Sequence, residues 1–248
     1  MLEEHKSRII EQLKDDSEYY KGIGKFYLSN SDIGVLLSNP QLFGVSRDDN
    51  KSFAEGRLFH QLLIEPEKAE QTVFVECSTR TTNIYKEFIS SNNLDFALLK
   101  SEYDNIVELT QVMKKNIKFF DDIYASGNQY EKPAIAEIQG RMWKGKTDIE
   151  CNDFLIDLKT TSDIQGFRWS AKKYNYDSQA YIYQQLFGKP LAFYVIDKVT
   201  KQVGIYHCSD EFIKNGEQKV RMAIEVHDKY FGANATEDVE NFFINETL

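Results

Sequence analysis

"GKTDIECNDFLIDLKTTSD", residues 145–163, places carboxylates within two short stretches that otherwise have the apolar character of β-strands. The Asn152-Asp153 pair between them predicts a two-residue hairpin turn of type I′, a geometry that Asn and Asp adopt readily. Pairing outward from this turn sets the register of the two strands: Cys151 with Phe154, Glu150 with Leu155, Ile149 with Ile156, and Asp148 with Asp157.

In this register Asp148 and Asp157 face each other across the hairpin, with Cβ atoms about 4.5–5.5 Å apart. Directly opposed like charges destabilise a sheet, and a buried charge is costly unless it is paired or binds a metal. A divalent cation removes this cost, because Mg²⁺ favours one or two carboxylates together with water and phosphate. Lys159 follows Asp157 by two residues and therefore points to the same face. The hairpin predicts two acids and a lysine at one spot.

A solvated acidic hairpin is the alternative interpretation, because Asp-x-Lys is a common sequence. The apolar residues around Asp157, in "FLIDLKTT", favour an interior strand over a solvated edge. Asp157 is therefore the residue on which the choice between a site and an ordinary surface depends.

The composition is that of a globular protein and excludes several classes. The chain has 248 residues, 42% of them hydrophobic, with only 4 Pro and 13 Gly, which suits a packed core and argues against long linkers. No apolar run approaches the roughly 18 residues of a membrane span, and the charged N-terminus is no signal peptide. The 3 cysteines are widely spaced, which speaks against a disulfide framework and favours a reducing cytoplasm.

The first half of the sequence has helical periodicity and the second half alternates between strands and helices. Apolar spacing predicts helix, loop and short helix in the first 40 residues, then helices over 52–68 and about 96–120. After Pro133 we expect strands at 134–143, 146–151, 154–160, 191–198 and 202–208, and helices at 176–188 and 209–231.

This order predicts an α/β fold in one domain covering residues 1–248. Residues 1–130 would form a mainly helical N-terminal part, 131–232 the β-sheet core and 233–248 a tail. We expect Asp177 or Ser178 to cap the helix at 176–188 and Gly188 to end it.

Asp148 and the later Asp157-Leu158-Lys159 resemble the signature of PD-(D/E)xK nucleases, in which acidic residues on adjoining strands bind metal and a lysine follows. Three further stretches are similar to RecB/RecE-like phage exonucleases of the exodeoxyribonuclease VIII type: the Gln-x-x-x-Tyr helix in "YNYDSQAYIY", the histidine motif in "GRLFHQLLIEPE" and the opening "YLSNSDIGVLLSNPQLF". The resemblance covers about residues 20–232. A sister branch carries a four-cysteine cluster, and the 3 scattered cysteines disfavour it.

The resemblance implies a restriction-endonuclease-like core, with a central mixed β-sheet flanked by helices and a helical N-terminal lobe. It assigns metal binding to Asp148, Asp157, the carbonyl of Leu158 and His60, and it gives Lys159 the role of positioning or deprotonating the attacking water. Taken alone, a histidine on an apolar helix is more often a core residue than a ligand.

Sites of this kind often have a further glutamate upstream, and Glu137 is our candidate because its strand parity fits the expected face. Glu131 and Glu150 compete with it. Glu150 shares the face of Asp148 by parity and could be an acid that contacts the metal-binding residues without binding the metal itself.

Gln179 and Tyr183 are four residues apart and share one helix face. The resemblance places them beside the active site in contact with the DNA backbone. The alternative is a half-buried tyrosine and a surface glutamine.

The net charge of −9 argues against a nucleic-acid partner, but a local basic segment answers this objection. "GFRWSAKKYNY", residues 166–176, contains Arg168, Lys172 and Lys173, no acid, and three interleaved aromatic residues. Basic groups for phosphates and aromatic faces for bases suit DNA contact. A solvated loop with core aromatics is the alternative.

The resemblance implies a Mg²⁺-dependent DNA exonuclease, with Mn²⁺ able to substitute, acting 5′→3′ on linear duplex ends in phage-type recombination or repair. It also implies a homo-oligomeric ring, a single-strand annealing partner and the cytoplasm of a bacterium or phage-infected host. An endonuclease with the same chemistry and a non-catalytic DNA-binding protein on the same fold are the alternatives.

Overall fold

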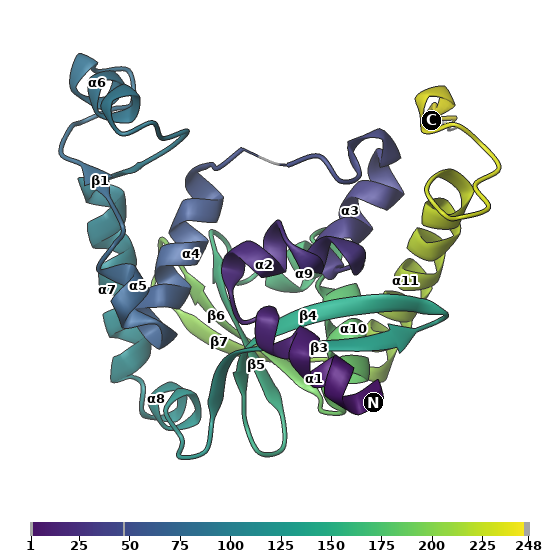
Figure 1. Ribbon diagram of the computed structural model, residues 1–248. Helices are drawn as coiled ribbons and strands as arrows, with labels where there is room; N and C mark the ends of the chain where they lie inside the picture. Colours follow the sequence, from purple (N-terminus) through teal and green to yellow (C-terminus); the bar gives the residue numbers. More distant parts are fainter. Residues whose placement is uncertain (1, 47, 246–248) are drawn as a thin grey trace.

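The computed structural model describes residues 2–46 and 48–245, and it has helices packed on both faces of one mixed β-sheet (Figure 1). The five strands lie in the order β3-β4-β5-β6-β7 and span Gln129–Ile138, Arg141–Glu150, Leu155–Thr161, Leu191–Asp197 and Val203–His207. Neighbouring strands run antiparallel except β5 and β6, which are parallel. The predicted fold class is therefore confirmed.

The first half of the chain is mainly helical, and a short parallel pair of strands interrupts it. Its elements are α1 (Leu2–Gln12), α2 (Asp16–Tyr20), η1 (Ile23–Phe26), α3 (Asn30–Ser38), η2 (Pro40–Leu42), α4 (Lys51–Ile64), α5 (Pro66–Ala69), β1 (Phe74–Val75), α6 (Asn83–Ser91), β2 (Leu98–Leu99), α7 (Lys100–Lys115) and α8 (Ile117–Ile123). Of the helices within the described residues, none has both the length and the apolarity to cross a membrane.

The single helix expected over 96–120 is wrong. Strand β2 ends at Leu99, and Asn116 separates α7 from α8 because its side chain accepts the backbone N–H of Phe119 and so starts a new helix.

Three helices belong to the second half: α9 (Phe167–Lys173), α10 (Tyr176–Phe187) and α11 (Asp210–Tyr230), with the short η3 (Val239–Asn241) after them. Gly188 ends α10 with φ of 68°, as predicted. The predicted N-cap is wrong, because Asn175 adopts the left-handed conformation at φ 59° and lets α10 begin at Tyr176. Asp177 lies inside the helix and pairs with Lys219 at 2.9 Å.

The β4–β5 hairpin has the predicted register, with Ile149 opposite Ile156 and Glu150 opposite Leu155. The Cys151 N–H donates to the Phe154 carbonyl at 2.9 Å. The turn type is different from the prediction, since type I′ needs positive φ at both central residues and neither Asn152 nor Asp153 has it.

The strand expected at 134–143 is in fact the end of β3, a turn and the start of β4. Gln139 and Gly140 have φ of 50° and 78°, the signs that a type I′ hairpin turn requires. This turn fixes the register of β3 against β4, so that Lys132 lies opposite Thr147 and Tyr130 opposite Ile149.

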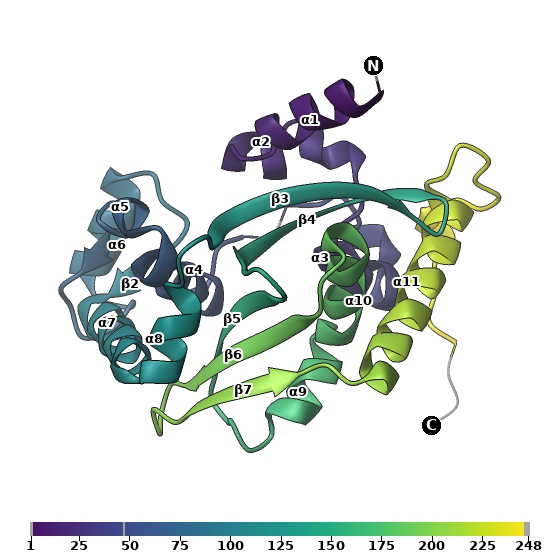
Figure 2. The ribbon, with the colours of Figure 1, turned by 90° about the horizontal axis from the view of Figure 1, so that it is seen from below.

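Each face of the sheet has its own apolar core, because successive residues of a strand point to opposite faces. In β5, Leu155 belongs to the core with α10 and α11, whereas Ile156 and Leu158 belong to the core with α4, α7 and α8. Figure 2 shows these two sets of helices on opposite sides of the sheet. The central strands are therefore interior, as the apolar run around Asp157 indicated.

Gly145 lies where α10 packs against β4, so a substitution at this residue tests how closely the two elements pack. A Cβ added to Gly145 would lie 2.6 Å from Leu186 Cδ1 and 2.8 Å from Tyr183 Cε1. We expect Gly145→Ala to lower the free energy of unfolding by about 1–3 kcal/mol, because the extra methyl group overpacks the interface. Urea unfolding measures the change.

Gly56→Ala is the matched control, because nothing lies within 4 Å of its added Cβ inside α4. Alanine there should raise the free energy of unfolding by up to about 1 kcal/mol. A Gly145→Ala protein as stable as the wild type would contradict the close approach of α10 to β4.

Candidate active site

The candidate site lies where β4 and β5 part. Beyond the Ile149–Ile156 pair the ladder stops, and the Asp148 carboxylate accepts a hydrogen bond from the backbone N–H of Leu158 at 2.6 Å. Asp148 thus spans the gap between the diverging strands, and the predicted Asp148–Asp157 pair is not part of the ladder. Both carboxylates are buried, with exposed fractions of 7% and 1%.

His60 reaches this point from α4. Its Nε2 lies 2.7 Å from the carbonyl oxygen of Leu158, and its Nδ1 lies 3.4 Å from Oδ2 of Asp148. The backbone of Leu158 therefore serves both neighbours, because its N–H donates to Asp148 and its carbonyl faces His60. The structure brings together His60, Asp148 and Leu158, three of the five metal-binding residues expected from the sequence.

Glu131 completes a group that could hold a cation. Within the described residues, the ligand atoms of His60, Glu131 and Asp148 lie within 4.8 Å of one another. Glu131 also has φ of 47°, which is uncommon for a residue other than glycine. Such a backbone costs of the order of 1–3 kcal/mol and is typical of functional positions.

Glu137 lies away from this group. It is exposed and pairs with Met142 near the end of the β3–β4 hairpin, six residues along β3 from Glu131. At about 3.4 Å per residue that separation is about 20 Å. The Gln139-Gly140 turn is the sequence signal that would have placed Glu131, and not Glu137, opposite Asp148. Glu150 instead forms ion pairs with Lys132 and Lys189.

Asp157 and Lys159 form an ion pair beside the group. Oδ2 of Asp157 contacts the Lys159 ammonium, and no other group among the described residues donates a hydrogen bond to it, which leaves this buried oxygen able to face a cation. Oδ1 accepts a hydrogen bond from the side chain of Gln179. The ammonium of Lys159 also lies 4.9 Å from the ring centroid of Tyr176, which holds it by a cation–π contact.

Gln179 and Tyr183 both point into the protein. Gln179 is 8% exposed and holds Asp157, and the hydroxyl of Tyr183 donates to the backbone carbonyl of Lys146 at 2.8 Å. Lys146 precedes Asp148 by two residues, so Tyr183 fixes β4 next to the site. In this structure both side chains on this helix face form hydrogen bonds to protein groups, namely Asp157 and the Lys146 carbonyl.

The charges of the site shift the pKa values of its members. Burial alone would lower the pKa of His60, but the charge of Asp148, its hydrogen bond to His60 and the charge of Asp157 together raise the pKa to about 9. Burial, and then the charge of Asp148, raises the pKa of Glu131 to about 8. Burial acts to raise the pKa of Asp148, but the contact with His60 holds it below its usual value.

The Asp157–Lys159 pair is shifted too. Burial is the largest influence on Asp157 and raises its pKa, although the Lys159 ammonium acts in the opposite direction. Burial would lower the pKa of Lys159, but Asp157 raises it above its usual value. Lys159 is therefore a cation at neutral pH.

The donor set fits a hard divalent cation. Carboxylate oxygens, a backbone carbonyl and one imidazole suit Mg²⁺ or Mn²⁺, whereas no thiolate of the described residues belongs to the group. A bound cation needs neutral histidine and ionised carboxylates, so binding would release protons from His60 and Glu131.

The basic segment is a helix and not a loop. Arg168, Lys172 and Lys173 are exposed on α9, and Trp169 beside them is 66% exposed. The segment connects to the site through Tyr174, whose ring centroid lies 6.1 Å from that of Tyr176.

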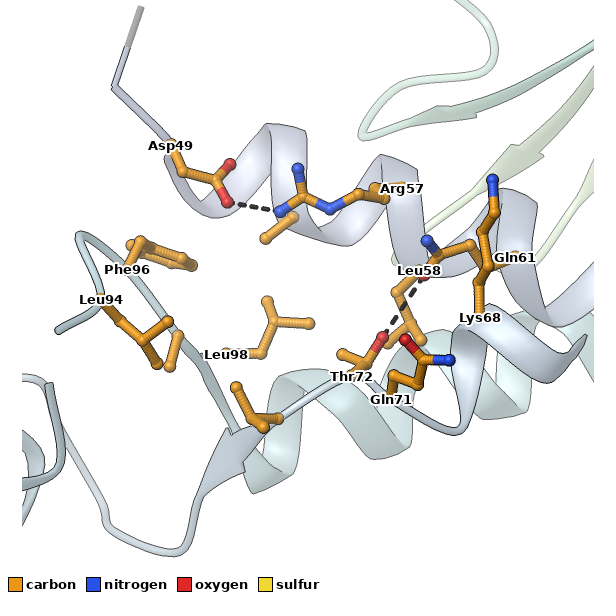
Figure 3. Close-up of a pocket in the computed structure, with 13 residues that line it drawn as sticks. Asp49, Arg57, Leu58, Gln61, Lys68, Gln71, Thr72, Leu94, Phe96 and Leu98 are labelled. Carbon is orange, nitrogen blue, oxygen red and sulfur yellow. Dashed lines mark hydrogen bonds and ion pairs between the residues drawn. The ribbon is translucent and has the colours of Figure 1, made fainter. Parts of the chain in front are cut away.

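The pocket in Figure 3 lies on the face of α4 next to the one that carries His60. It has a volume of about 310 Å³, an apolar floor that includes Leu58 and Leu98, and polar side chains at its rim. Lys68 and Gln61 stand at one end and Asp49 at the other. None of the three residues that could hold a cation, His60, Glu131 and Asp148, lines this pocket.

A mixed sheet whose diverging strands carry Asp148 and an Asp157-Leu158-Lys159 run, with an acid and a histidine beside them, has the arrangement of a PD-(D/E)xK-type site. The comparison with protein families agrees. The chain belongs to the family described as PDDEXK-like domain of unknown function (DUF3799), whose model matches residues 41–234.

The chain is similar to a crystal structure from Eubacterium rectale that is described as a "putative exonuclease", with 17% identity and a TM-score of 0.62. The match covers 94% of this chain and 95% of that chain, and at this identity it shows the fold alone. A structure of the protein SSO0001 is 15% identical over 80% of this chain and 85% of that one, and its TM-score of 0.32 supports no argument. No curated protein sequence matches this chain.

The raised pKa values of His60 and Glu131 predict that the metal-free protein loses stability as the pH rises. Each group binds a proton more tightly in the folded state, so its stabilising contribution is complete below the unfolded pKa, 6.5 and 4.5, and is lost towards about 9 and 8. The melting temperature in EDTA should therefore fall between about pH 6 and 9.

Two controls accompany this measurement. Glu131→Gln should show a shallower fall, and saturating Mn²⁺ should shrink it for the wild type because the cation takes the place of the protons. A melting temperature in EDTA that is flat or rises over this range would contradict the arrangement of buried charges.

Proposed function

We propose that the protein is a Mg²⁺-dependent DNA exonuclease that hydrolyses phosphodiester bonds from the ends of linear duplex DNA. One observation carries the proposal: Asp148, His60 and the Leu158 carbonyl meet at a buried point on a PDDEXK-like fold, with the Asp157–Lys159 pair beside them.

The cation would be held by Asp148, His60, the Leu158 carbonyl and Asp157, with Glu131 within reach. When bound, it would supply the positive charge that stabilises the scissile phosphate and activates water. Mn²⁺ shares the preference for these ligands and should replace Mg²⁺.

The protein's own groups orient the reaction. Lys159 is a buried cation held by Asp157 and by the Tyr176 ring, so its ammonium can donate a hydrogen bond to the attacking water or to a phosphate oxygen. Gln179 holds Asp157 from the other side, and Tyr183 fixes β4 through the Lys146 carbonyl. We assign Gln179 and Tyr183 a positioning role rather than direct DNA contact.

DNA as substrate is supported by the basic and aromatic side chains of α9, which adjoin Lys159 through Tyr174 and Tyr176. Arg168, Lys172 and Lys173 would bind phosphates there, so that a local basic surface serves an acidic protein. Action at DNA ends is supported by the motif resemblance to RecE-type exonucleases and by the description of the Eubacterium rectale relative. The same resemblance supports 5′→3′ polarity, a ring-shaped oligomer and an annealing partner.

Linear and closed-circular duplexes of the same sequence test the function. With Mg²⁺ the protein should degrade end-labelled linear DNA and leave the circle intact, and EDTA should stop the reaction. Cleavage of the circle would identify an endonuclease, and binding without cleavage of either form would identify a non-catalytic DNA-binding protein.

Asp157→Asn should reduce cleavage of the linear duplex to the level seen with EDTA. Asparagine can still accept the Gln179 hydrogen bond at Oδ1, but it removes the charge that faces Lys159 and the cation. Asp153→Asn, in the exposed turn of the same hairpin, is the matched control and should cleave like the wild type. Wild-type cleavage by a folded Asp157→Asn protein would exclude this site as the catalytic centre.

A further inference from the structure

Asp16 of α2 lies between two lysines that come from different elements, β4 and α5. Its Oδ1 is 2.8 Å from Lys146 Nζ of β4, and its Oδ2 is 2.8 Å from Lys68 Nζ of α5. One carboxylate thus joins the sheet to the helical lobe. Helix α2 lies outside residues 41–234, the part that matches the family.

This cluster adjoins the metal-binding group. Lys146 and Asp148 are two residues apart on β4 and share one face, about 7 Å apart along the strand. The separation along β4 is comparable to one nucleotide step of an extended DNA strand.

Lys146 is buried and Lys68 is partly exposed, so the two lysines differ in how strongly each requires a nearby anion. The Lys146 side chain is only 7% exposed, so its ammonium requires an anion close by. The side chain of Asp16 is 47% exposed and that of Lys68 is 41% exposed, so their ion pair is partly solvated and weak. Because the Asp16 carboxylate is partly exposed and lies between the two ammonium groups, another anion can take its place from the solvent.

Helix α2 does not depend on Asp16 for its position. The ring of Tyr19 lies under both Lys144 and Lys146, at 4.3 and 4.7 Å from their ammonium nitrogens, and the Lys144 ammonium also donates to the Tyr19 carbonyl. Substitution of Asp16 by asparagine can therefore remove the negative charge between the lysines while α2 stays in place.

We propose that Lys68 and Lys146 bind a phosphodiester of the DNA strand, one step from the phosphate at the metal-binding group, and that Asp16 occupies this subsite when no DNA is bound. This inference rests on the proposed function. A phosphate gives Lys146 the anion that it requires, and its negative charge repels the Asp16 carboxylate. Lys68 also stands at the edge of the pocket in Figure 3, along which the strand can continue.

The experiment compares Asp16→Asn with Asp15→Asn, using a short linear duplex with single-stranded overhangs and Ca²⁺ to block cleavage. Both variants remove one negative charge and so raise the net charge by one. Asp15 is the N-cap of α2, which accepts the Glu18 N–H, and asparagine preserves that cap. Only Asp16→Asn therefore releases Lys146, and it leaves Lys68 paired with Glu65 alone, at 2.7 Å. We expect Asp16→Asn to bind DNA about threefold to tenfold more tightly than Asp15→Asn at low salt.

The lysine variants complete the test. Lys68→Met and Lys146→Met should each weaken binding and reduce the salt slope of the logarithm of the binding constant by about 0.7–0.9. Adding Asp16→Asn to Lys146→Met should give no further gain, because the carboxylate no longer competes for a site. Equal affinities for Asp16→Asn and Asp15→Asn, or weaker binding by Asp16→Asn, would overturn the subsite.

The outcome is separable from that of the proposed function. A wild type that degrades linear DNA while the two asparagine variants bind alike would overturn the subsite and leave the nuclease in place. A wild type that binds DNA in Ca²⁺ but does not cleave it in Mg²⁺ would reject the nuclease, and the comparison of the variants would still decide the subsite. A wild type that binds no DNA would overturn both.

Discussion

The hydrogen bond from the Leu158 N–H to the Asp148 carboxylate is the contact on which the site depends. β4 and β5 pair closely at Ile149 and Ile156 and then separate, which would leave a buried N–H without a partner. Asp148 satisfies that donor with a charge, and the same geometry turns the Leu158 carbonyl towards His60. One side chain thus both ends the ladder and begins the metal-binding group.

Buried charge is the cost of this arrangement, and the surrounding residues limit it. His60 balances Asp148, Lys159 balances Asp157, and Gln179 supplies a hydrogen bond to the second oxygen of Asp157. Among the described residues no cation forms an ion pair with Glu131, and burial together with the Asp148 charge raises its pKa. A cation is the natural partner for such a surplus of oxygen atoms.

Turn and capping rules predicted features of the fold that depend on residues adjacent in the sequence. The register of the β4–β5 hairpin and the end of α10 at Gly188 follow from turn and capping chemistry. His60 was found only through its motif, because an apolar helix with one histidine has no signal of its own. Strand parity favours Glu137 over Glu131 because parity alone cannot locate a turn, and the sequence pattern places the Gln139-Gly140 pair within a strand.

Contacts between distant segments could not be predicted. The cluster around Asp16 joins residues from α2, α5 and β4, and no periodicity connects them. The inward hydrogen bonds of Gln179 and Tyr183 likewise depend on how α10 crosses the sheet, which its packing against distant segments, including β4 at Gly145, determines.

A crystal grown with Mn²⁺, with data collected at the manganese absorption edge, tests the central claim most directly. The account predicts an anomalous peak about 2.1–2.3 Å from an oxygen of Asp148 and from the Leu158 carbonyl, with His60 in its coordination shell. A peak elsewhere on the protein with none between these three residues, under conditions in which DNA is cleaved, would contradict it.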